Sequence, residues 1–132
     1  MGKASNNRDY VEVIYNEKDR PFTPYPGQLA RYLTDRFQIP AGVSLLDVGC
    51  GGGECLQGLI QRGVKGYGID ASQAASRVCP QADLKRGDIE NDDLPYGNDH
   101  FDVVFSKSVV EHLYYPEKLF LEIHRILKPG GL

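Results

Sequence analysis

From residue 43 onward, short apolar runs alternate with segments whose apolar residues recur every three to four positions. The short runs predict buried strands, and the longer segments predict amphipathic helices. This alternation is typical of βαβ units, in which a parallel sheet is covered by helices on both faces. The predicted strands are 43–48, 64–70, 82–88 and 101–106, and the predicted helices are 27–40, 54–63, 72–79 and 116–131. The fold class is therefore α/β, with a doubly wound and mostly parallel sheet.

Proline, glycine and serine mark the ends of these helices. Pro40 follows the first helix, Gly63 is placed to end the second, and Pro80 halts the third. Ser72 is a candidate N-cap of the third helix because its hydroxyl can accept a hydrogen bond from the first turn. In the last helix one apolar stripe is expected to face the core, formed by Leu119, Phe120, Ile123, Ile126 and Leu127.

Residues 1–27 do not follow the alternating pattern. Pro21, Pro24 and Pro26 interrupt any long helix, and the aromatic residues between them are too many for a plain linker. We expect this irregular segment either to close over a pocket as a lid or to cover the core. The remaining residues, 28–132, form the predicted domain.

Composition narrows the class of protein. The chain has 132 residues, which suffices for one domain with a core, and its formal net charge is −3. That charge, without a run of Lys and Arg, makes a nucleic-acid partner unexpected. No apolar run approaches the length of a membrane span. Cys50, Cys55 and Cys79 lack CxxC spacing, so we interpret them as reduced thiols of a cytoplasmic protein and not as metal ligands.

Three of the predicted strands end at an aspartate: Asp47, Asp70 and Asp88. Open parallel sheets bind ligands beyond the carboxyl ends of their strands, so these side chains are expected to surround one site. Asp70 follows the glycine-rich loop by about 20 residues, the spacing at which a carboxylate can accept hydrogen bonds from both hydroxyls of a ribose. The ligand is therefore predicted to be a nucleoside derivative.

The loop after the first strand, in "LLDVGCGGGE", has glycine at four of the five positions 49–53. Glycines at the end of a buried strand allow the backbone to approach a ligand closely. The loop matches GxGxG through Gly49, Gly51 and Gly53 but not the dinucleotide pattern GxGxxG, because Glu54 occupies the sixth position. An acid there is a poor neighbour for a pyrophosphate, and the chain has no phosphate-binding GxxxxGK[ST] loop either.

From Leu45 to its C-terminus, the sequence resembles the class I S-adenosylmethionine-dependent methyltransferases of type 11. "LLDVGCGGGE" resembles their first motif, "GYGIDAS" their second strand with its acid, "GDIENDDLPYGNDHFDVVFS" their third and fourth strands, and "RILKPGGL" the approach to their fifth strand. The resemblance implies a Rossmann-like methyltransferase fold, S-adenosyl-L-methionine as cofactor, and methyl transfer to an acceptor that we expect to be a small molecule.

The resemblance also implies roles for individual residues, arranged along the expected cofactor. Its amino-acid and sulfonium end would lie along Asp47, Gly49, Cys50, Gly51 and Gly53. At the other end, Asp70 would hold the ribose diol, Ala71 would lie beside the adenine, Asp88 would bond the adenine amino group and Ile89 would offer a backbone donor. Ser106 would lie near the methyl group.

His112, in "SKSVVEHL", is the one candidate general base, because histidine is suited to take a proton from an acceptor hydroxyl. A histidine that only packs against or caps a helix is the commoner alternative. Some ubiquinone-type O-methyltransferases have an ExxEH metal-binding pattern at this place. Ser108 replaces its first acid here, so no metal is expected.

Members of the resembled family continue into a fifth strand, so we expect the chain to be truncated and the outer edge of its fourth strand to be open. Such an edge could pair with a second copy in a homo-oligomer. Three functions stay open: a methyltransferase, a module that binds S-adenosylmethionine but is inactive without a partner or the missing strands, and a nicotinamide-dependent oxidoreductase. Glu54 and the GxGxG spacing disfavour the third.

Overall fold

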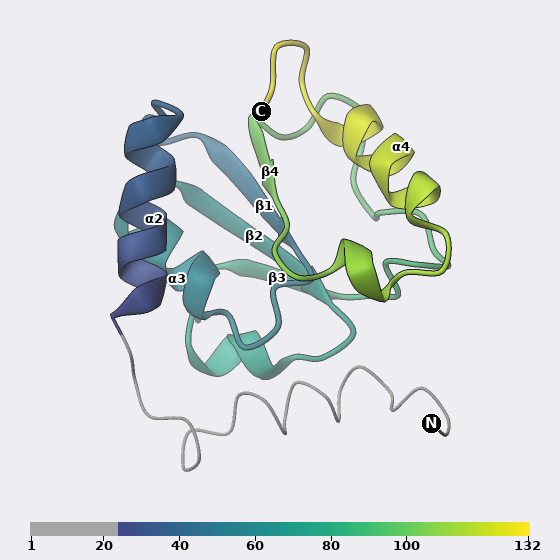
Figure 1. Cartoon of the computed structure of the whole chain (residues 1–132), viewed down its shortest axis with the longest axis horizontal. Helices are drawn as coiled ribbons and strands as arrows, with labels where there is room; N and C mark the ends of the chain where they lie inside the picture. Colours follow the sequence, from purple (N-terminus) through teal and green to yellow (C-terminus); the bar gives the residue numbers. More distant parts are fainter. Residues whose placement is uncertain (1–23) are drawn as a thin grey trace.

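The computed structural model describes residues 24–132 and contains a sheet of four parallel strands (Figure 1). The strands are β1 (Ser44–Val48), β2 (Lys65–Asp70), β3 (Asp83–Arg86) and β4 (Val103–Phe105), and the sheet order is β3-β2-β1-β4. In the register, Asp47 lies opposite Gly68 of β2 and Phe105 of β4. Because β1 lies between β2 and β4, the chain changes its direction of progress across the sheet at β1, and such a switch point is where open parallel sheets bind ligands.

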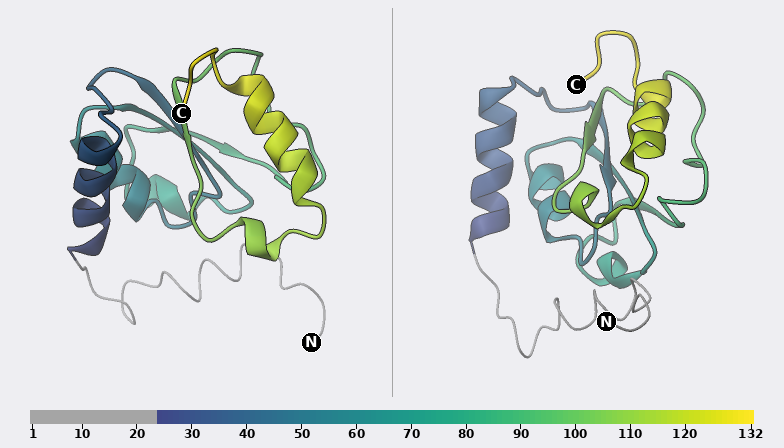
Figure 2. Two further views of the ribbon diagram at one scale, coloured as in Figure 1. Left: turned by 45° about the horizontal axis from the view of Figure 1, so that its top comes forward. Right: turned by 45° about the vertical axis from the view of Figure 1, so that its right-hand side comes forward.

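Helices cover both faces of the sheet, as the alternating pattern predicts. On one face lie α2 (Tyr25–Arg36) and α3 (Glu54–Gln61), while α4 (Pro116–Ile126) lies on the other (Figures 1 and 2). Each face has its own apolar cluster, with Leu45, Leu56 and Leu59 fully buried on the α3 side. Leu46, Phe101 and Ile126 are fully buried on the α4 side. The α/β prediction is confirmed, and no helix within residues 24–132 is long and apolar enough to cross a membrane.

Three helix predictions differ from the structure at their ends or in their type. The last helix, predicted over 116–131, ends at Ile126. Helix α2 begins at Tyr25, earlier than predicted, because Pro26 lies in its first turn, where the missing N–H of proline has no intrahelical partner to lose. The segment predicted as a third helix contains only η1, a 3₁₀ helix over Ala74–Arg77. The prediction of Ser72 as N-cap is wrong, because Gln73 is the N-cap of η1 and no side chain caps it. The Ser72 Oγ still accepts a hydrogen bond from the Ala74 N–H at 3.0 Å, just at the start of η1.

The apolar stripe of α4 is narrower than predicted. Leu119 and Ile126 are buried, but Phe120 is 56% exposed, so the prediction that Phe120 faces the core is wrong. Hydrophobic periodicity does not determine how wide the buried face of a helix is. Whether a residue at the margin of that face is buried depends on the segment that packs beside it. Before α4 lies η2, a short 3₁₀ helix over Val110–His112.

Strand β4 has three residues, fewer than the apolar run 101–106 predicts. The first part of that run turns toward the segment after α4: the N–H of Phe101 donates to Ile126 O at 2.9 Å, and Lys128 N–H donates to Phe101 O at 2.9 Å. The outer edge of β4 also differs from the open edge predicted. Val104 N–H donates to Leu132 O at 2.9 Å, and Leu132 N–H donates to Asp102 O at 3.0 Å.

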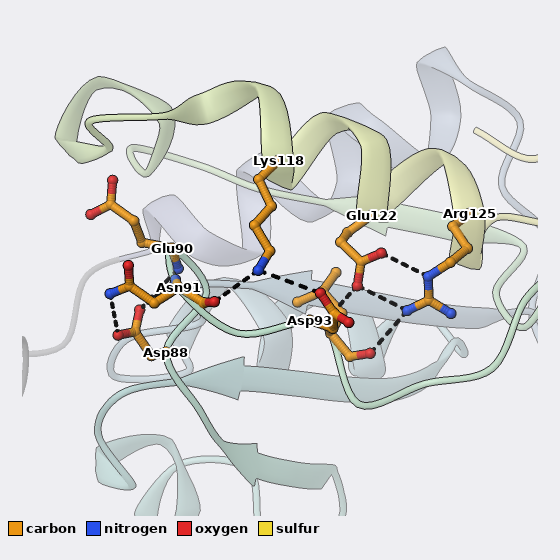
Figure 3. A network of polar contacts seen from close by, with 8 residues as sticks. Asp88, Glu90, Asn91, Asp93, Lys118, Glu122 and Arg125 are labelled. Atoms are coloured by element: carbon orange, nitrogen blue, oxygen red, sulfur yellow. Dashed lines mark hydrogen bonds and ion pairs between the residues drawn. The ribbon is translucent and has the colours of Figure 1, made fainter.

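The long loop between β3 and β4 is held against α4 by a polar network (Figure 3). Lys118 Nζ donates to Asn91 O at 2.7 Å, and Glu122 accepts from the Leu94 N–H at 2.7 Å. Arg125 donates to the carbonyl oxygens of Leu94 at 3.0 Å and Tyr96 at 2.8 Å. Backbone groups of an irregular loop need such partners when they approach the core, and here one face of α4 supplies them.

Candidate functional site

The glycine-rich loop connects β1 to α3 in a tight, left-handed path. Gly49, Gly51 and Gly53 have φ angles of 75°, 55° and 88°, a region that residues with a Cβ rarely adopt. The loop is fastened to the neighbouring strand by the N–H groups of Gly49 and Cys50, which donate to Ile69 O at 2.7 and 3.2 Å. The sequence "VGCGGGE" therefore forms a strand-to-helix turn with α3 starting at Glu54.

Two of these glycines pack closely against the protein itself. A Cβ on Gly49 would lie 2.4 Å from a methyl carbon of Val109. A Cβ on Gly53 would lie 2.7 Å from Cys79 Sγ and 2.8 Å from Ala75 Cβ. The interpretation that the glycines serve a ligand is thus incomplete, because Gly49 and Gly53 are also required by the packing of the loop.

Asp47, in β1 one residue before the strand ends, is the acid whose environment is most unusual. Its side chain is 2% exposed, and burial raises the pKa of its carboxyl well above the usual value. The negative charge of Asp70 raises this pKa further, whereas the positive charge of Lys107 lowers it. Within residues 24–132 no hydrogen bond reaches the carboxyl oxygens of Asp47. A buried acid without a hydrogen bond is costly for folding and is typical of a functional site.

A cavity of about 850 Å³ opens in front of Asp47, between the glycine-rich loop and the first turns of α2. Of the predicted site residues, Asp47, Gly49 and Cys50 line it. Other parts of the wall come from the start of α2, the whole length of α3 and the end of β4. They include Tyr25, Gln28, Arg31, Glu54, Cys55, Gln57, Gly58, Gln61, Arg62, Phe105, Lys107 and Ser108. The volume lies within the range of small-molecule sites.

Asp70 is the last residue of β2 and Ala71 follows it, next to the glycine-rich loop but outside the cavity lining. The Asp70 carboxylate accepts a hydrogen bond from the Ser72 N–H at 2.9 Å. Burial raises the pKa of Asp70, and hydrogen bonds from the backbone of Ser72 and Gly51 oppose that increase. The Ala71 carbonyl accepts a hydrogen bond from Arg86 at 2.9 Å. Gly51 itself is buried, so the strand-end acid and the glycine-rich loop form one hydrogen-bonded unit.

Asp88 lies beyond β3 in an exposed position, where its carboxylate organises its own loop. Oδ1 accepts from the N–H groups of Glu90 at 3.0 Å and Asn91 at 3.2 Å, and Oδ2 accepts from Asn91 Nδ2 at 2.8 Å. These bonds lower the pKa of Asp88, with the Asn91 side chain as the largest cause. A carboxylate has about four acceptor positions, so one more donor can be accommodated. Ile89, the next residue, is half-buried in the same turn.

Ser106 and His112 lie after β4, and neither lines the cavity in this structure. The Ser106 hydroxyl donates to Val48 O at 3.1 Å, which ties the end of β4 to the end of β1. His112 is exposed in η2. The predicted roles of Ser106 near the methyl group and of His112 as a general base therefore stay predictions. Within residues 24–132 no three His, Cys, Asp or Glu side chains are grouped to hold a metal ion.

Within residues 24–132 no disulfide bond joins Cys50, Cys55 or Cys79. Cys79 is fully buried, and its Sγ lies 3.3 Å from Gly53 O as a weak donor. Burial raises the pKa of Cys79 to about 11, and burial likewise raises the pKa of Cys50. Such thiols stay protonated and behave as small hydrophobic side chains.

Sequence reasoning did not identify the cationic side of the cavity. Lys107 and Ser108 follow Ser106 directly, so the rule that ligands bind at the carboxyl ends of parallel strands could have included them. Tyr25, Gln28 and Arg31 had no such signal. They reach the site only because α2 packs beside α3, and that packing is not encoded in any local motif.

The chain is similar to known methyltransferases in sequence and in structure. The methyltransferase domain family matches residues 46–132. An uncharacterised methyltransferase of Synechocystis sp. is 39% identical over 105 residues, covering 74% of this chain and 48% of that protein. A ubiquinone biosynthesis O-methyltransferase of Maricaulis maris is 32% identical over 103 residues, covering 69% of this chain and 39% of that protein.

Among solved structures, a candidate S-adenosyl-L-methionine-dependent methyltransferase from Methanococcus maripaludis superimposes with a TM-score of 0.82 at 23% identity. The superposition covers 99% of this chain and 64% of that protein. The chain thus spans half or less of the length of the two sequence relatives, at 48% and 39%. The sequence match, the parallel sheet and the glycine-rich loop after β1 agree, and the chain belongs to the methyltransferase domain family.

Proposed function

We propose that the protein transfers a methyl group from S-adenosylmethionine to a small-molecule acceptor. The observation that supports this most directly is Asp47, a buried carboxyl without a hydrogen bond from residues 24–132, which faces a cavity beside a glycine-rich loop at the switch point of a parallel sheet. A carboxylate so placed suits a ligand with positive charge, and it repels the phosphates of a dinucleotide.

The residues present fit S-adenosylmethionine over its whole length. Asp47 and the backbone of Gly49 and Cys50, which line the cavity, would hold the charged amino-acid and sulfonium end of the cofactor. Asp70 would accept hydrogen bonds from the ribose diol. Asp88 has room for one further donor, and in the proposal that donor is the adenine amino group.

When bound, the cofactor supplies a methyl group already activated on a sulfonium, so the protein has mainly to orient the acceptor and exclude water. The first turns of α2 and the end of β4 wall the cavity on the sides away from the glycine-rich loop. Transfer would break the bond between the sulfonium sulfur and the methyl carbon, leave S-adenosylhomocysteine, and release from the acceptor a proton that a base must take up. His112 is the residue that we propose to accept it.

A small-molecule acceptor is supported by the size of the cavity and by the net charge of −3. It is also supported by the relative from Maricaulis maris, which is an O-methyltransferase of ubiquinone biosynthesis. A nicotinamide-dependent oxidoreductase is disfavoured because Glu54 opens α3 and lines the same cavity, which places an acid where a pyrophosphate would bind.

The second candidate is a module that binds S-adenosylmethionine without turning over an acceptor by itself. This candidate is favoured because the chain spans only 39–48% of the length of the two sequence relatives. Formation of S-adenosylhomocysteine that depends on an added acceptor would favour the methyltransferase, whereas binding without such formation would favour the module.

The decisive experiment is calorimetric titration of the chain with S-adenosylmethionine and, separately, with NAD. We expect 1:1 binding of the first and none of the second. Binding of NAD alone would overturn the proposal. After a positive result, a panel of phenols, carboxylic acids and amines is tested for acceptor-dependent S-adenosylhomocysteine.

A further inference from the structure

The cavity is lined by charged groups of both signs. Asp47 and Glu54 bring negative charge from the end of β1 and the start of α3, while Lys107, Arg31 and Arg62 bring positive charge from the end of β4, from α2 and from the end of α3. Lys107 and Asp47 interact electrostatically: the positive charge of Lys107 lowers the pKa of Asp47, whereas burial raises it. A ligand that carries both a cationic and an anionic group would match this arrangement.

Lys107 is available for such a ligand. Within residues 24–132 it makes no salt bridge, and its ammonium lies 5.7 Å from the centre of the Tyr25 ring. Tyr25 is the first residue of α2, so this contact places the ammonium beside the N-terminus of that helix. The ammonium is therefore held at the cavity wall by an aromatic ring and not neutralised by an acid.

The N-terminus of α2 adds to the positive charge of the cavity lining. The helix has no acidic residue in its first turn and no side chain capping its first N–H groups, and residues 25–28 line the cavity. The partial positive charge of a helix N-terminus favours an anion. By itself this feature would identify no ligand, but here it lies beside a lysine and lines the same cavity as a buried acid that has no hydrogen bond from residues 24–132.

We infer that Lys107 is the carboxylate-binding residue of the site and holds the carboxylate of the cofactor's amino-acid portion, while Asp47 attracts its ammonium. This inference rests on the proposed function, because it assigns the amino-acid portion of S-adenosylmethionine to the cavity. The sequence motifs place only Asp47 and the loop residues 49–53 at that end of the cofactor, and Lys107 belongs to none of them.

The test compares two donors that differ only in this carboxylate: S-adenosylmethionine and decarboxylated S-adenosylmethionine. Binding of both is measured by calorimetry for the wild-type chain, for Lys107→Met and for the control Lys65→Met. Lys65 is also exposed, and it does not line the cavity. Methionine keeps most of the lysine stem and removes the charge.

For Lys107→Met we expect about a 10-fold weaker affinity for S-adenosylmethionine, the size of one hydrogen bond to a charged group. The affinity for the decarboxylated donor should be unchanged, and Lys65→Met should bind both donors as the wild type does. Thermal unfolding of each variant verifies that the fold is kept, which we expect because Lys107 is exposed.

Two results would overturn the inference while leaving the proposed function intact. Equal weakening for both donors would mean that Lys107 acts on another part of the cofactor. Unchanged affinity for both would mean that no cofactor carboxylate binds Lys107, and that its charge serves the acceptor. A wild-type chain that binds neither donor would contradict the proposed function, and the inference with it.

Discussion

At the scale of single residues, the chemistry of the site is concentrated in Asp47. Its side chain is 2% exposed at the end of a buried strand. The cost of burying a carboxyl there is visible in its raised pKa, with burial as the largest cause. A group of this kind destabilises the fold while it prepares a site, a trade-off that is common in enzymes.

Replacement of Asp47 by asparagine should therefore stabilise the protein. We expect Asp47→Asn to raise the free energy of unfolding at pH 8 by about 1–3 kcal/mol, since it removes the penalty of a buried charge. The same variant should bind S-adenosylmethionine more weakly. Thermal or urea unfolding and calorimetry measure the two effects.

The pH dependence of that stabilisation follows from the raised pKa. The folded protein holds the Asp47 proton to higher pH than the unfolded chain, so this group favours folding below its ordinary pKa of 3.8 and progressively less as pH rises through the folded value. The difference between wild type and Asp47→Asn should thus shrink on going from pH 8 to pH 4. A difference that grows toward acid would contradict the raised pKa.

Gly53 illustrates a second residue-scale effect, that of backbone conformation. Gly53 has a φ angle of 88°, and a Cβ at this position would lie 2.7 Å from Cys79 Sγ. The substitution Gly53→Ala therefore combines backbone strain with a steric clash. We expect a loss of about 2–4 kcal/mol in unfolding free energy, measured by urea denaturation. The control is Gly97→Ala, where a Cβ would meet nothing within 4 Å and the change should stay within about 0.5 kcal/mol. Equal effects of the two substitutions would exclude this explanation.

At the scale of elements, the loop from residue 88 to 98 is held by the Asp88 carboxylate within it and by hydrogen bonds from α4. Arg125 alone donates hydrogen bonds to the carbonyl oxygens of Leu94 and Tyr96 and to the Asn98 side chain, and it pairs with Glu122 at 2.7 Å (Figure 3). The Glu90 carboxylate also accepts the N–H groups of Tyr114 and Tyr115, just before α4. The loop that carries Asp88 and Ile89 is therefore positioned by contacts distant in sequence.

Removal of the Arg125 guanidinium should loosen this loop. For Arg125→Met we expect about 1–3 kcal/mol lower stability, because at least one buried carbonyl loses its donor. We also expect faster amide hydrogen exchange over residues 89–98. Arg77→Met, an exposed arginine of η1, is the matched control and should change neither quantity. Unchanged exchange in Arg125→Met would show that the loop is held by other contacts.

Much of the element order was predictable, and the exceptions have physical reasons. The four strands and the helices α2, α3 and α4 follow from hydrophobic periodicity, because each has an apolar face to bury. Helices α3 and α4 pack against the sheet, and α2 packs against α3. The apolar run at 101–106 was predicted as one strand, yet Phe101 pairs with the segment after α4. Periodicity shows that such a residue is buried, but its hydrogen-bond partner depends on distant segments.

At the scale of the whole molecule, the site lies where elements of both halves of the chain converge. Several segments meet at one end of the sheet (Figures 1 and 2). They are the carboxyl ends of β1, β2 and β4, the glycine-rich loop and the first turns of α2. The predicted irregular segment and possible lid is 1–27: residues 1–23 lie outside the described residues, and Tyr25–Gly27 form the start of α2. Its role as a lid stays a prediction. Ligand binding at such a convergence point should stabilise the whole fold.

We therefore expect S-adenosylhomocysteine to raise the melting temperature of the protein. At a ligand concentration of 100 times the dissociation constant, the gain in unfolding free energy is about 2.7 kcal/mol. Hydrogen exchange should slow most in residues 47–54 and 70–72, next to the proposed cofactor. NAD is the control ligand, and a larger shift with NAD than with S-adenosylhomocysteine would contradict the proposed function.

The sequence by itself determined the fold class, the family and the three strand-end acids, because these depend on local periodicity and on short motifs. Asp47, Asp70 and Asp88 are recognisable from their positions along the chain, since parallel strands bring their carboxyl ends to one edge. Only the tertiary structure decided that Asp47 is buried without a hydrogen bond from residues 24–132, and that Lys107 and the first turns of α2 line the same cavity as Asp47. Burial, pairing and enclosure are properties of segments that meet in space, and no stretch of sequence contains them.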